Sequence, residues 1–353
     1  MREQAISGCL IGMAVGDALG LPREGLTPRR AACLFPSADR FHFLFGRGMF
    51  SDDTEHACMT VQALLVSGGE PTRFIRSLGW RLRWWLLGLP FAAGKATLKS
   101  CLKLWLGFSP KSSGVWSAGN GPASRAPIIG VCFGDQLDRL RELIRRATRI
   151  THRDPKAEWG ALAMARATHL ACTSRDRALA LNEVTAFIAS ALPPEAGELM
   201  ELIDRTARSV AANQSTESFA DELGLKRGVS GYMLHTVPVA LHAWMCFPNN
   251  YREAVLAAIR CGGDSDSTAA LVGALVGARV GVEGIPAEWR RGLCEWPRDL
   301  RWIARLAREL AKGLEEGKPR RGVPLSFFGI LARNLLFDLT VLAHGFRRLL
   351  PPY

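Results

Sequence analysis

Apolar residues recur along the chain at helical spacing, and short polar or Gly/Pro-containing breaks divide them into segments of helix length. The chain offers no convincing strand-like alternation and no hairpin dipeptide flanked by it. The pattern therefore predicts an all-α fold. The segments expected to be helical are 5–20, 54–89, several successive helices within 136–220, then 229–245, 268–281 and 298–313.

Two of these segments carry small residues along one face. Each glycine inside a helix costs about 1 kcal/mol relative to alanine, so repeated glycines indicate that another backbone packs against them. We therefore expect the first segment and the segment 268–281 to pack together in close contact. The small residues are Gly8, Gly12, Gly16 and Gly20 in the first and Ala270, Gly273, Ala274, Gly277, Ala278 and Gly281 in the second.

Two acidic clusters each precede an apolar helical segment. In the second cluster, Gly262 and Gly263 lead into the acids, and Asp266 or Ser267 is the expected N-cap. Adjacent carboxylates are costly to bury unless a cation or a proton compensates, and carboxylate and hydroxyl oxygens are typical ligands of Mg²⁺ and Mn²⁺. Two unrelated helix caps remain the alternative. The candidate metal ligands are Ser51, Asp52, Asp53, Asp264, Asp266 and Ser267.

The same clusters carry a family resemblance. SDDT together with GGDSDSTAALVGALVGA resembles the paired signature of the ADP-ribosylglycohydrolase family, the relatives of the dinitrogenase reductase-activating glycohydrolase. The resemblance spans about residues 5 to 300 and implies one compact helical domain with a di-metal centre at helix N-termini. Further matching pieces, in order, are GCLIGMAVGDALGLPRE, AGNGPASR, ITHRDP and HTVPVALHAW.

The resemblance also implies roles for individual residues. Two Mg²⁺ or Mn²⁺ ions would bind the diol of the distal ribose, and Glu24 would orient or deprotonate the attacking water. Asp17 is expected to support the site from the glycine stripe of the first helix. A long irregular loop, 107–135, would seat the diphosphate and proximal ribose through exposed backbone N–H groups. The implied catalytic residues are Glu24, Asp52, Asp53 and Asp264, and the implied substrate-binding residues are Gly119, Asn120, Gly121, Arg125 and His152.

Alternatives stay open for three of these residues. Glu24 is also compatible with an exposed loop position, Arg125 with a structural pair for an acid, and His152 with a turn cap. The chain also departs from the family pattern. Serines replace threonines and keep the hydroxyl, whereas Pro122 removes a hydroxyl and a backbone donor from the glycine loop. The departures are Ser51, Ser265, Ser267, Pro122, Ser124 and His235.

Composition narrows the class of protein only slightly. Of the 353 residues, 48% are hydrophobic and 22% are charged, which is typical of a folded globular protein. Nine scattered cysteines without a CxxC pair favour reduced thiols in the cytoplasm over a zinc cluster. A net charge of +12 permits acidic partners, but no nucleic-acid motif accompanies it. The apolar stretch 5–15 is expected to be a core helix rather than a signal peptide.

The C-terminal residues are expected to form an extension of the main domain. Residues 1–314 are expected to form the glycohydrolase-like domain, and 315–353 a charged linker followed by an apolar helix. No window of 18 uninterrupted apolar residues occurs, so no spanning helix is expected. We expect the tail to pack on the body of the chain, and association with a membrane surface or a partner is the alternative.

Taken with the resemblance, the sequence predicts a metal-dependent hydrolase that releases ADP-ribose from a modified protein or a small acceptor. Arginine is the first expected acceptor residue and serine the second. Two other functions remain open: a catalytically inactive relative that binds ADP-ribose, and a different metal-dependent phosphoester hydrolase.

Overall fold

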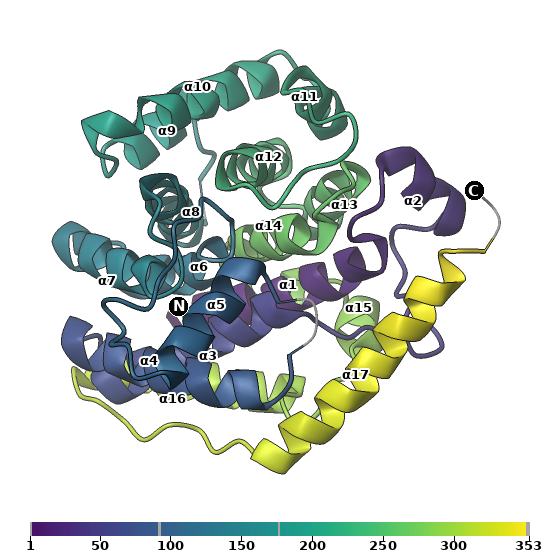
Figure 1. Ribbon diagram of the computed structural model, residues 1–353. Helices are drawn as coiled ribbons and strands as arrows, with labels where there is room; N and C mark the ends of the chain where they lie inside the picture. The colour runs from purple at the N-terminus through teal and green to yellow at the C-terminus, as the bar shows by residue number, and fades with distance from the viewer. Residues whose placement is uncertain (1, 91–92, 176, 351–353) are drawn as a thin grey trace.

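The computed structural model describes residues 2–90, 93–175 and 177–350 (Figure 1). The described residues are helical and contain no β-strand beyond isolated bridges, so the predicted all-α class is confirmed. The first helices are α1 (Arg2–Gly20), α2 (Pro28–Leu34), α3 (Asp52–Ser67), α4 (Pro71–Leu87), α5 (Lys95–Trp105), α6 (Ala126–Phe133), α7 (Leu137–Arg149) and α8 (Pro155–Thr173). The others are α9 (Leu181–Ala189), α10 (Gly197–Ala211), α11 (Thr216–Glu222), α12 (Met233–Cys246), α13 (Tyr251–Arg260), α14 (Ser265–Val280), α15 (Ala287–Gly292), α16 (Leu300–Glu316) and α17 (Phe327–Arg347). Short 3-10 helices lie at η1 (Leu21–Arg23), η2 (Ala123–Arg125), η3 (Pro194–Ala196) and η4 (Val282–Gly284).

The centre of the fold is the contact between α1 and α14, the most extensive between any two elements (Figure 1). A Cβ atom at Gly12 would overlap the carbonyl oxygen of Gly273, and one at Gly8 would overlap that of Gly277. The two backbones therefore touch directly, as the glycine stripes predict. Tyr251 on α13 donates a hydrogen bond to the Gly12 carbonyl oxygen at 2.5 Å and completes this contact.

The other helices surround this pair. α6, α8, α12, α13 and α16 pack on α1 or α14, and α3 packs on α4 and α16. Nearly all of α1 and α14 is buried, so both helices are apolar on every side rather than amphipathic. The acids at the end of α1 and the start of α14 are consequently fixed by the core itself.

Several predicted boundaries are wrong, each for a local reason. The predicted helix 54–89 is two helices, because Gly68 and Gly69 adopt positive φ and end α3. The irregular loop predicted at 107–135 ends earlier, since α6 forms within it. The helix predicted from 229 starts at Met233, and the linker predicted from 315 starts at Gly317, where a left-handed residue ends α16.

The C-terminal helix α17 lies along the outside of the body (Figure 1). It packs through one face, on which Arg333, Asn334 and Phe337 are buried. Phe337 joins a small apolar cluster with Leu21 and Phe43. The predicted packing of the tail on the body is thus correct for this face, while the opposite face is exposed.

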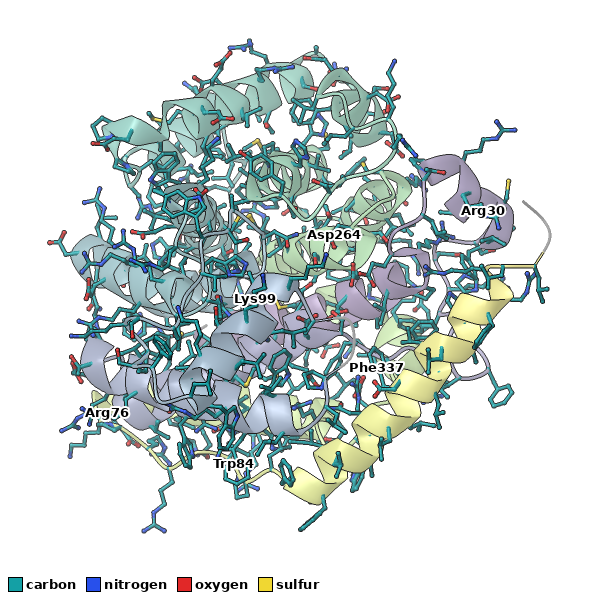
Figure 2. All side chains as sticks on the ribbon, in the orientation of Figure 1. Arg30, Arg76, Trp84, Lys99, Asp264 and Phe337 are labelled. Atoms are coloured by element: carbon teal, nitrogen blue, oxygen red, sulfur yellow. The ribbon has the colours of Figure 1, made fainter. Side chains whose placement is uncertain are left out.

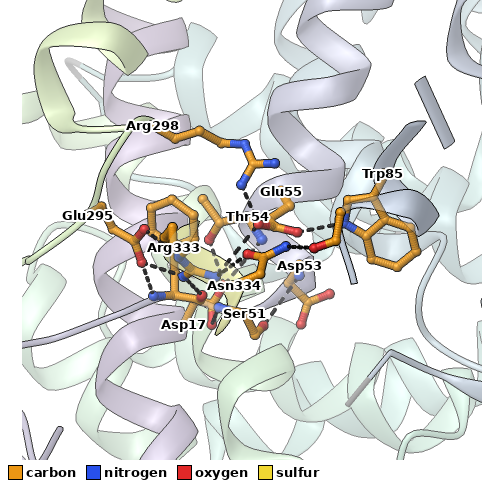
Figure 3. Close-up of polar contacts among 12 residues, drawn as sticks. Asp17, Ser51, Asp53, Thr54, Glu55, Trp85, Glu295, Arg298, Arg333 and Asn334 are labelled. Carbon is orange, nitrogen blue, oxygen red and sulfur yellow. Dashed lines mark hydrogen bonds and ion pairs between the residues drawn. The ribbon is translucent and has the colours of Figure 1, made fainter. Parts of the chain in front are cut away.

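An ion-pair network fixes α17 to the start of α3 (Figure 3). Arg333 Nη2 lies 2.6 Å from Glu295 Oε1 and donates to the Phe50 carbonyl oxygen at 2.6 Å. Glu55 on α3 pairs with Arg298 and accepts a hydrogen bond from the Trp85 indole. Burial opposes the charge of Glu55, but Arg298 and Arg333 outweigh burial and lower its pKa. Losing one partner of such a buried network costs about 3–5 kcal/mol.

Two helical segments are long and apolar enough to cross a membrane by length and composition alone. The first, Arg2–Arg23, is wholly buried in the core, as expected for a core helix. The second is α17, of which 22% is buried. Polar residues interrupt α17 at helical spacing on its inner face, so it contains no uninterrupted apolar run of spanning length.

The α1–α14 contact leads to a stability prediction. Gly12→Ala should lower the free energy of unfolding by about 1–3 kcal/mol or more, because the added methyl group meets a carbonyl oxygen that can move only with its helix. Urea denaturation of the purified variant measures this. Gly345→Ala on α17 is the matched control: its added methyl group meets no atom within 4 Å, so it should be neutral or slightly stabilising. Equal stability of the two variants would contradict the direct backbone contact.

Candidate active site

The first acidic cluster is held at the N-terminus of α3 by Asp17 of α1. Asp17 is fully buried and accepts hydrogen bonds from Ser51 N at 2.8 Å and from Thr54 N and Oγ1 at 3.2 and 2.6 Å. Ser51 Oγ caps the helix by accepting from Asp53 N at 3.3 Å. Asp17 therefore shapes the turn that presents Asp52 and Asp53, in keeping with its expected supporting role.

The second cluster lies at the start of α14. Gly262 and Gly263 adopt φ values of +65° and +73°, which turn the chain sharply before the helix. Gly263 exchanges backbone hydrogen bonds of 2.7 Å with the loop after η1: Gly25 N donates to Gly263 O, and Gly263 N donates to Leu26 O. The Glu24 loop is thereby fixed beside the start of α14.

The predicted N-cap of this helix is wrong. The N-cap position is Asp264, two residues before Asp266 and three before Ser267, because the two glycines complete the turn sooner. The Asp264 side chain does not cap the helix. Its Oδ2 accepts a hydrogen bond of 2.6 Å from Asn120 Nδ2 instead. Both Asp264 and Asp266 line the cavity described next.

The two clusters meet in a cavity of about 530 Å³. Asp264, which marks the start of α14, is labelled near the middle of the view in Figure 2. Ser51 does not line this cavity. It lines a second, smaller cavity together with Asp52 and Asp266. Segments far apart in the sequence thus converge on one site. The predicted residues that line the main cavity are Glu24, Asp52, Asp53, Gly119, Asn120, Gly121, His152, Asp264, Asp266 and Ser267.

The carboxylates perturb one another strongly. Burial and the neighbouring Asp264 raise the pKa of Asp53 to about 6 and that of Glu24 to about 7. Burial and Asp53 raise the pKa of Asp17 to about 8. Burial and nearby acids also raise the pKa of Asp52 and Asp266 well above the usual range. Bringing these groups together therefore costs free energy that protons or a cation can offset.

The donor set fits a hard divalent cation in its chemistry. It consists of carboxylate and hydroxyl oxygens, which Mg²⁺ and Mn²⁺ prefer. Asp266 is 4% exposed, and its Oδ1 atom is buried without a hydrogen-bond partner among the described residues. Within those residues, however, no three His, Cys, Asp and Glu side chains are already arranged to hold a metal ion. The di-metal centre stays a prediction.

Two predicted substrate contacts need correction. Arg125 is fully buried and does not line the cavity; it bonds to His56 Nδ1 at 2.8 Å and to Thr151 Oγ1 at 2.6 Å. Arg125 is therefore a buried structural residue that joins His56 to Thr151. In the glycine loop, Asn120 N already donates to Gly231 O at 2.9 Å and Gly119 N to Ser117 Oγ at 3.2 Å. These amides are occupied, because the loop pairs with the segment before α12.

His152 remains at the cavity wall, where its Nδ1 lies 2.8 Å from Thr151 Oγ1. Burial and Arg125 lower its pKa to about 3, so the ring is neutral near pH 7. Sequence reasoning missed several lining residues, since none stands in a distinctive motif. The cation among them is Lys95, which follows a break at Gly94. The others include Thr97, Ser117 and Ser230.

The C-terminal end of α17 and Arg348, which follows it, contact the Glu24 loop. Arg348 Nη1 donates to the Glu24 carbonyl oxygen at 2.8 Å, and its Nη2 donates to that of Pro22 at 2.7 Å. His344 Nε2 lies 2.9 Å from the same Pro22 oxygen. A loop that carries a candidate catalytic residue is thus supported by the C-terminal helix.

The chain is similar in sequence and in fold to known proteins. A model of the ADP-ribosylglycohydrolase family matches residues 1–320. The chain is similar to the ADP-ribosylarginine hydrolase Tri1 of Pseudomonas putida (strain GB-1), with 27% identity over 87% of this chain and 79% of that protein. It is 25% identical to the ADP-ribosyl-dinitrogen reductase glycohydrolase of Rhodospirillum rubrum, over 80% of this chain and 87% of that protein. A solved structure described as an ADP-ribosylglycohydrolase-related protein complex shares the fold, with a TM-score of 0.61 and 24% identity over 89% of this chain and 99% of that one.

The contact with α17 leads to a prediction about the loop. Arg348→Gln should raise amide hydrogen exchange in residues 21–27 about tenfold, since charge-assisted hydrogen bonds of this kind contribute about 1.5–3 kcal/mol. Mass spectrometry of the corresponding peptides measures the exchange. Arg301→Gln, at an exposed position of α16, is the matched control and should leave the loop unchanged. Identical exchange in both variants would show that α17 does not support the loop.

Proposed function

The chain belongs to the ADP-ribosylglycohydrolase family, and from this premise we propose that it is a metal-dependent hydrolase that cleaves an ADP-ribosyl glycosidic bond and releases ADP-ribose. The convergence of both acidic clusters and the Glu24 loop on one cavity carries the proposal. The names of the relatives support an ADP-ribosyl hydrolase in general. The metal, the acceptor and the roles of individual residues are the proposed part.

The acids and serines at the two helix starts are the proposed ligands. Two Mg²⁺ or Mn²⁺ ions, when bound, would orient the distal ribose and lower the pKa of a bound water. The raised pKa values of Asp52, Asp53 and Asp266 support a cation there, because a cation would offset their repulsion. The proposed ligands are Ser51, Asp52, Asp53, Asp264, Asp266 and Ser267.

Glu24 is the proposed general base. Glu24 borders the cavity on a loop that is hydrogen-bonded to Gly263. Because its pKa is raised to about 7, both its charged and its protonated form are populated near neutral pH. Glu24 takes a proton from the attacking water while the oxygen of that water bonds to the anomeric carbon. The bond from this carbon to the acceptor breaks, and the acceptor leaves with the proton that Glu24 had taken up, so the carboxylate is regenerated. The products are ADP-ribose and the unmodified acceptor.

The rest of the cavity suits the remainder of the substrate. Lys95 in the cavity wall supplies positive charge for a diphosphate, and neutral His152 offers a hydrogen-bonding edge beside Gly119. We propose arginine as the first acceptor, because a guanidinium cation complements the acidic cluster and one relative is named an ADP-ribosylarginine hydrolase. Serine is the second.

We also propose a cytoplasmic location. All nine cysteines are free thiols, and burial raises the pKa of most of them, which suits a reducing compartment.

The metal requirement is tested by Asp264→Asn. The near-isosteric amide keeps an oxygen to accept from Asn120 but loses the charge, so cleavage of ADP-ribosyl-arginine should fall at least about a hundredfold, with weaker Mn²⁺ binding by calorimetry. Asp204→Asn on α10 is the matched control and should retain activity. EDTA should abolish cleavage by the wild type, and added Mg²⁺ or Mn²⁺ should restore it. Full activity of Asp264→Asn in excess EDTA would rule out the mechanism.

The role of Glu24 is tested by Glu24→Gln. A base that transfers a proton contributes about 10²–10⁴-fold, so kcat should fall by this factor while ADP-ribose affinity changes little. Steady-state kinetics and ADP-ribose titration measure the two quantities, with Glu201→Gln as a control on α10. The assay should include ADP-ribosyl-serine and a phosphomonoester. Tight ADP-ribose binding without cleavage of any linkage would identify a binding module, and cleavage of the phosphomonoester alone a phosphoester hydrolase.

A further inference from the structure

The outer face of α17 is apolar along its whole length. Phe328, Leu339 and Phe346 are 80%, 66% and 69% exposed, so these side chains stand almost free of the body. No charged residue interrupts the stripe that they define at helical spacing. The same stripe includes Ala332, Leu335, Leu336, Leu342, Ala343, Leu349 and Leu350.

The inner face of the same helix carries the polar groups. Arg333 pairs with Glu295, Asn334 donates to the Gly88 carbonyl oxygen at 2.7 Å, and His344 lies against Pro22 O. Polar residues that a surface helix usually turns outward thus face the body beside Phe337, and the outward face is apolar instead. Exposing a contiguous apolar patch to water is unfavourable, and such a patch usually marks a surface that binds a partner or a membrane.

The hydrogen bonds of the polar face determine whether α17 could span a bilayer or only lie on its surface. To cross a bilayer, α17 would have to leave the body and place Arg333 and Asn334 in hydrocarbon, with loss of their hydrogen bonds. Held on the body, it exposes only its outer side. A helix with one apolar side lies in the plane of a membrane interface, with that side immersed.

Aromatic residues extend the apolar face at both sides of the helix. Near its start, Trp84 contacts Phe327 with ring centroids 5.6 Å apart, and Trp296 lies against Gly329. Trp84 and Trp296 are 42% and 59% exposed, and Figure 2 shows Trp84 beside the start of α17. On the other side, the loop whose Phe43 packs on Phe337 exposes the whole Phe45 ring. Tryptophan and phenylalanine at such an edge are typical of proteins that sit at the lipid headgroup level.

The charges around the face favour anionic lipid. α17 contains a single acid, the partly exposed Asp338, and its last turn contains Arg347. Exposed Arg47 neighbours Phe45, and Arg30 of α2 donates to the Arg348 carbonyl oxygen beside the end of α17. The whole chain has a net charge of +12. Basic residues beside an apolar interfacial helix are attracted to negatively charged headgroups.

From these observations we propose that α17 docks the protein, in the plane of the interface, on the surface of an anionic lipid bilayer. The family match ends at residue 320, before α17, so the proposal is independent of the hydrolase activity. The other possible occupant is a second copy of the chain. A second copy would bring another strongly basic surface to the same face, and this like charge favours the lipid.

Sedimentation of the full chain with vesicles tests the proposal. The protein should sediment with vesicles of phosphatidylcholine and phosphatidylserine, bind vesicles of phosphatidylcholine alone more weakly, and lose affinity as salt is raised. The double variant Leu339→Glu, Leu342→Glu should need at least about tenfold more lipid for half-binding, because two immersed side chains become charged. The control Ala186→Glu, Ala211→Glu adds the same charge at exposed positions of α9 and α10, across the molecule from α17 (Figure 1), and should bind nearly as the wild type.

Thermal unfolding first establishes that each variant is folded. If the glutamate pair does not fold, Leu339→Gln, Leu342→Gln replaces it with the same expected direction. Wild-type protein that stays in the supernatant with the anionic vesicles overturns the proposal, and so does a folded α17 variant that binds as the wild type does. A dimer in analytical ultracentrifugation that the α17 variant dissociates, without vesicle binding by the wild type, assigns the face to a second copy instead.

Discussion

The direct backbone contact between α1 and α14 is the constraint on which the site depends. Gly8, Gly12 and Gly16 leave no side chain between the helices, so the position of α14 is determined by carbonyl oxygens of α1 and not by adjustable side chains. The contact continues to Gly20, where a Cβ atom would overlap Ser265 and Asp266. α1, which carries Asp17, and α14, which starts after Asp264, are therefore held in a single register relative to each other. A rigid core contact of this kind suits a site that must keep several carboxylates close together.

That proximity is unfavourable by itself, and the surrounding structure shows how it is maintained. Asp17 accepts three hydrogen bonds from Ser51 and Thr54 at the start of α3, and the network of Glu55, Arg298 and Arg333 also holds this helix (Figure 3). Burial, and after it the neighbouring carboxylates, raise the pKa of Asp52 and Asp266, so their charged forms are unfavourable in the folded protein. Cations at this place would offset that cost, so the proposed metals would also stabilise the cluster. The same network joins α17 to the site, and the proposed lipid-binding face thus shares its support with the proposed catalytic acids.

The sequence contained enough to predict the helical class, the pairing of the two glycine-striped helices and the convergence of Asp52, Asp53 and Asp264. The first two follow from helical periodicity and from the glycine spacing. The third also rests on the family resemblance, because Ser and Asp before a helix are common caps as well. The burial of Arg125 could not be predicted, because its partners His56 and Thr151 come from distant segments. The occupied amides of the glycine loop depend likewise on pairing with Gly231. The reversed polarity of α17 was also beyond the sequence, because composition does not show which face meets the body.

The α1–α14 contact should position the proposed catalytic acids, and two glycines of that contact allow a direct test. Gly20→Ala acts beside Ser265 and Asp266, whereas Gly8→Ala acts at the far end, against Gly277. The measurement is kcat/KM for ADP-ribosyl-arginine at a temperature where both variants are folded. The loss of kcat/KM should be at least about tenfold greater for Gly20→Ala, since small displacements of catalytic groups are costly. Equal kcat/KM values for the two variants would contradict it.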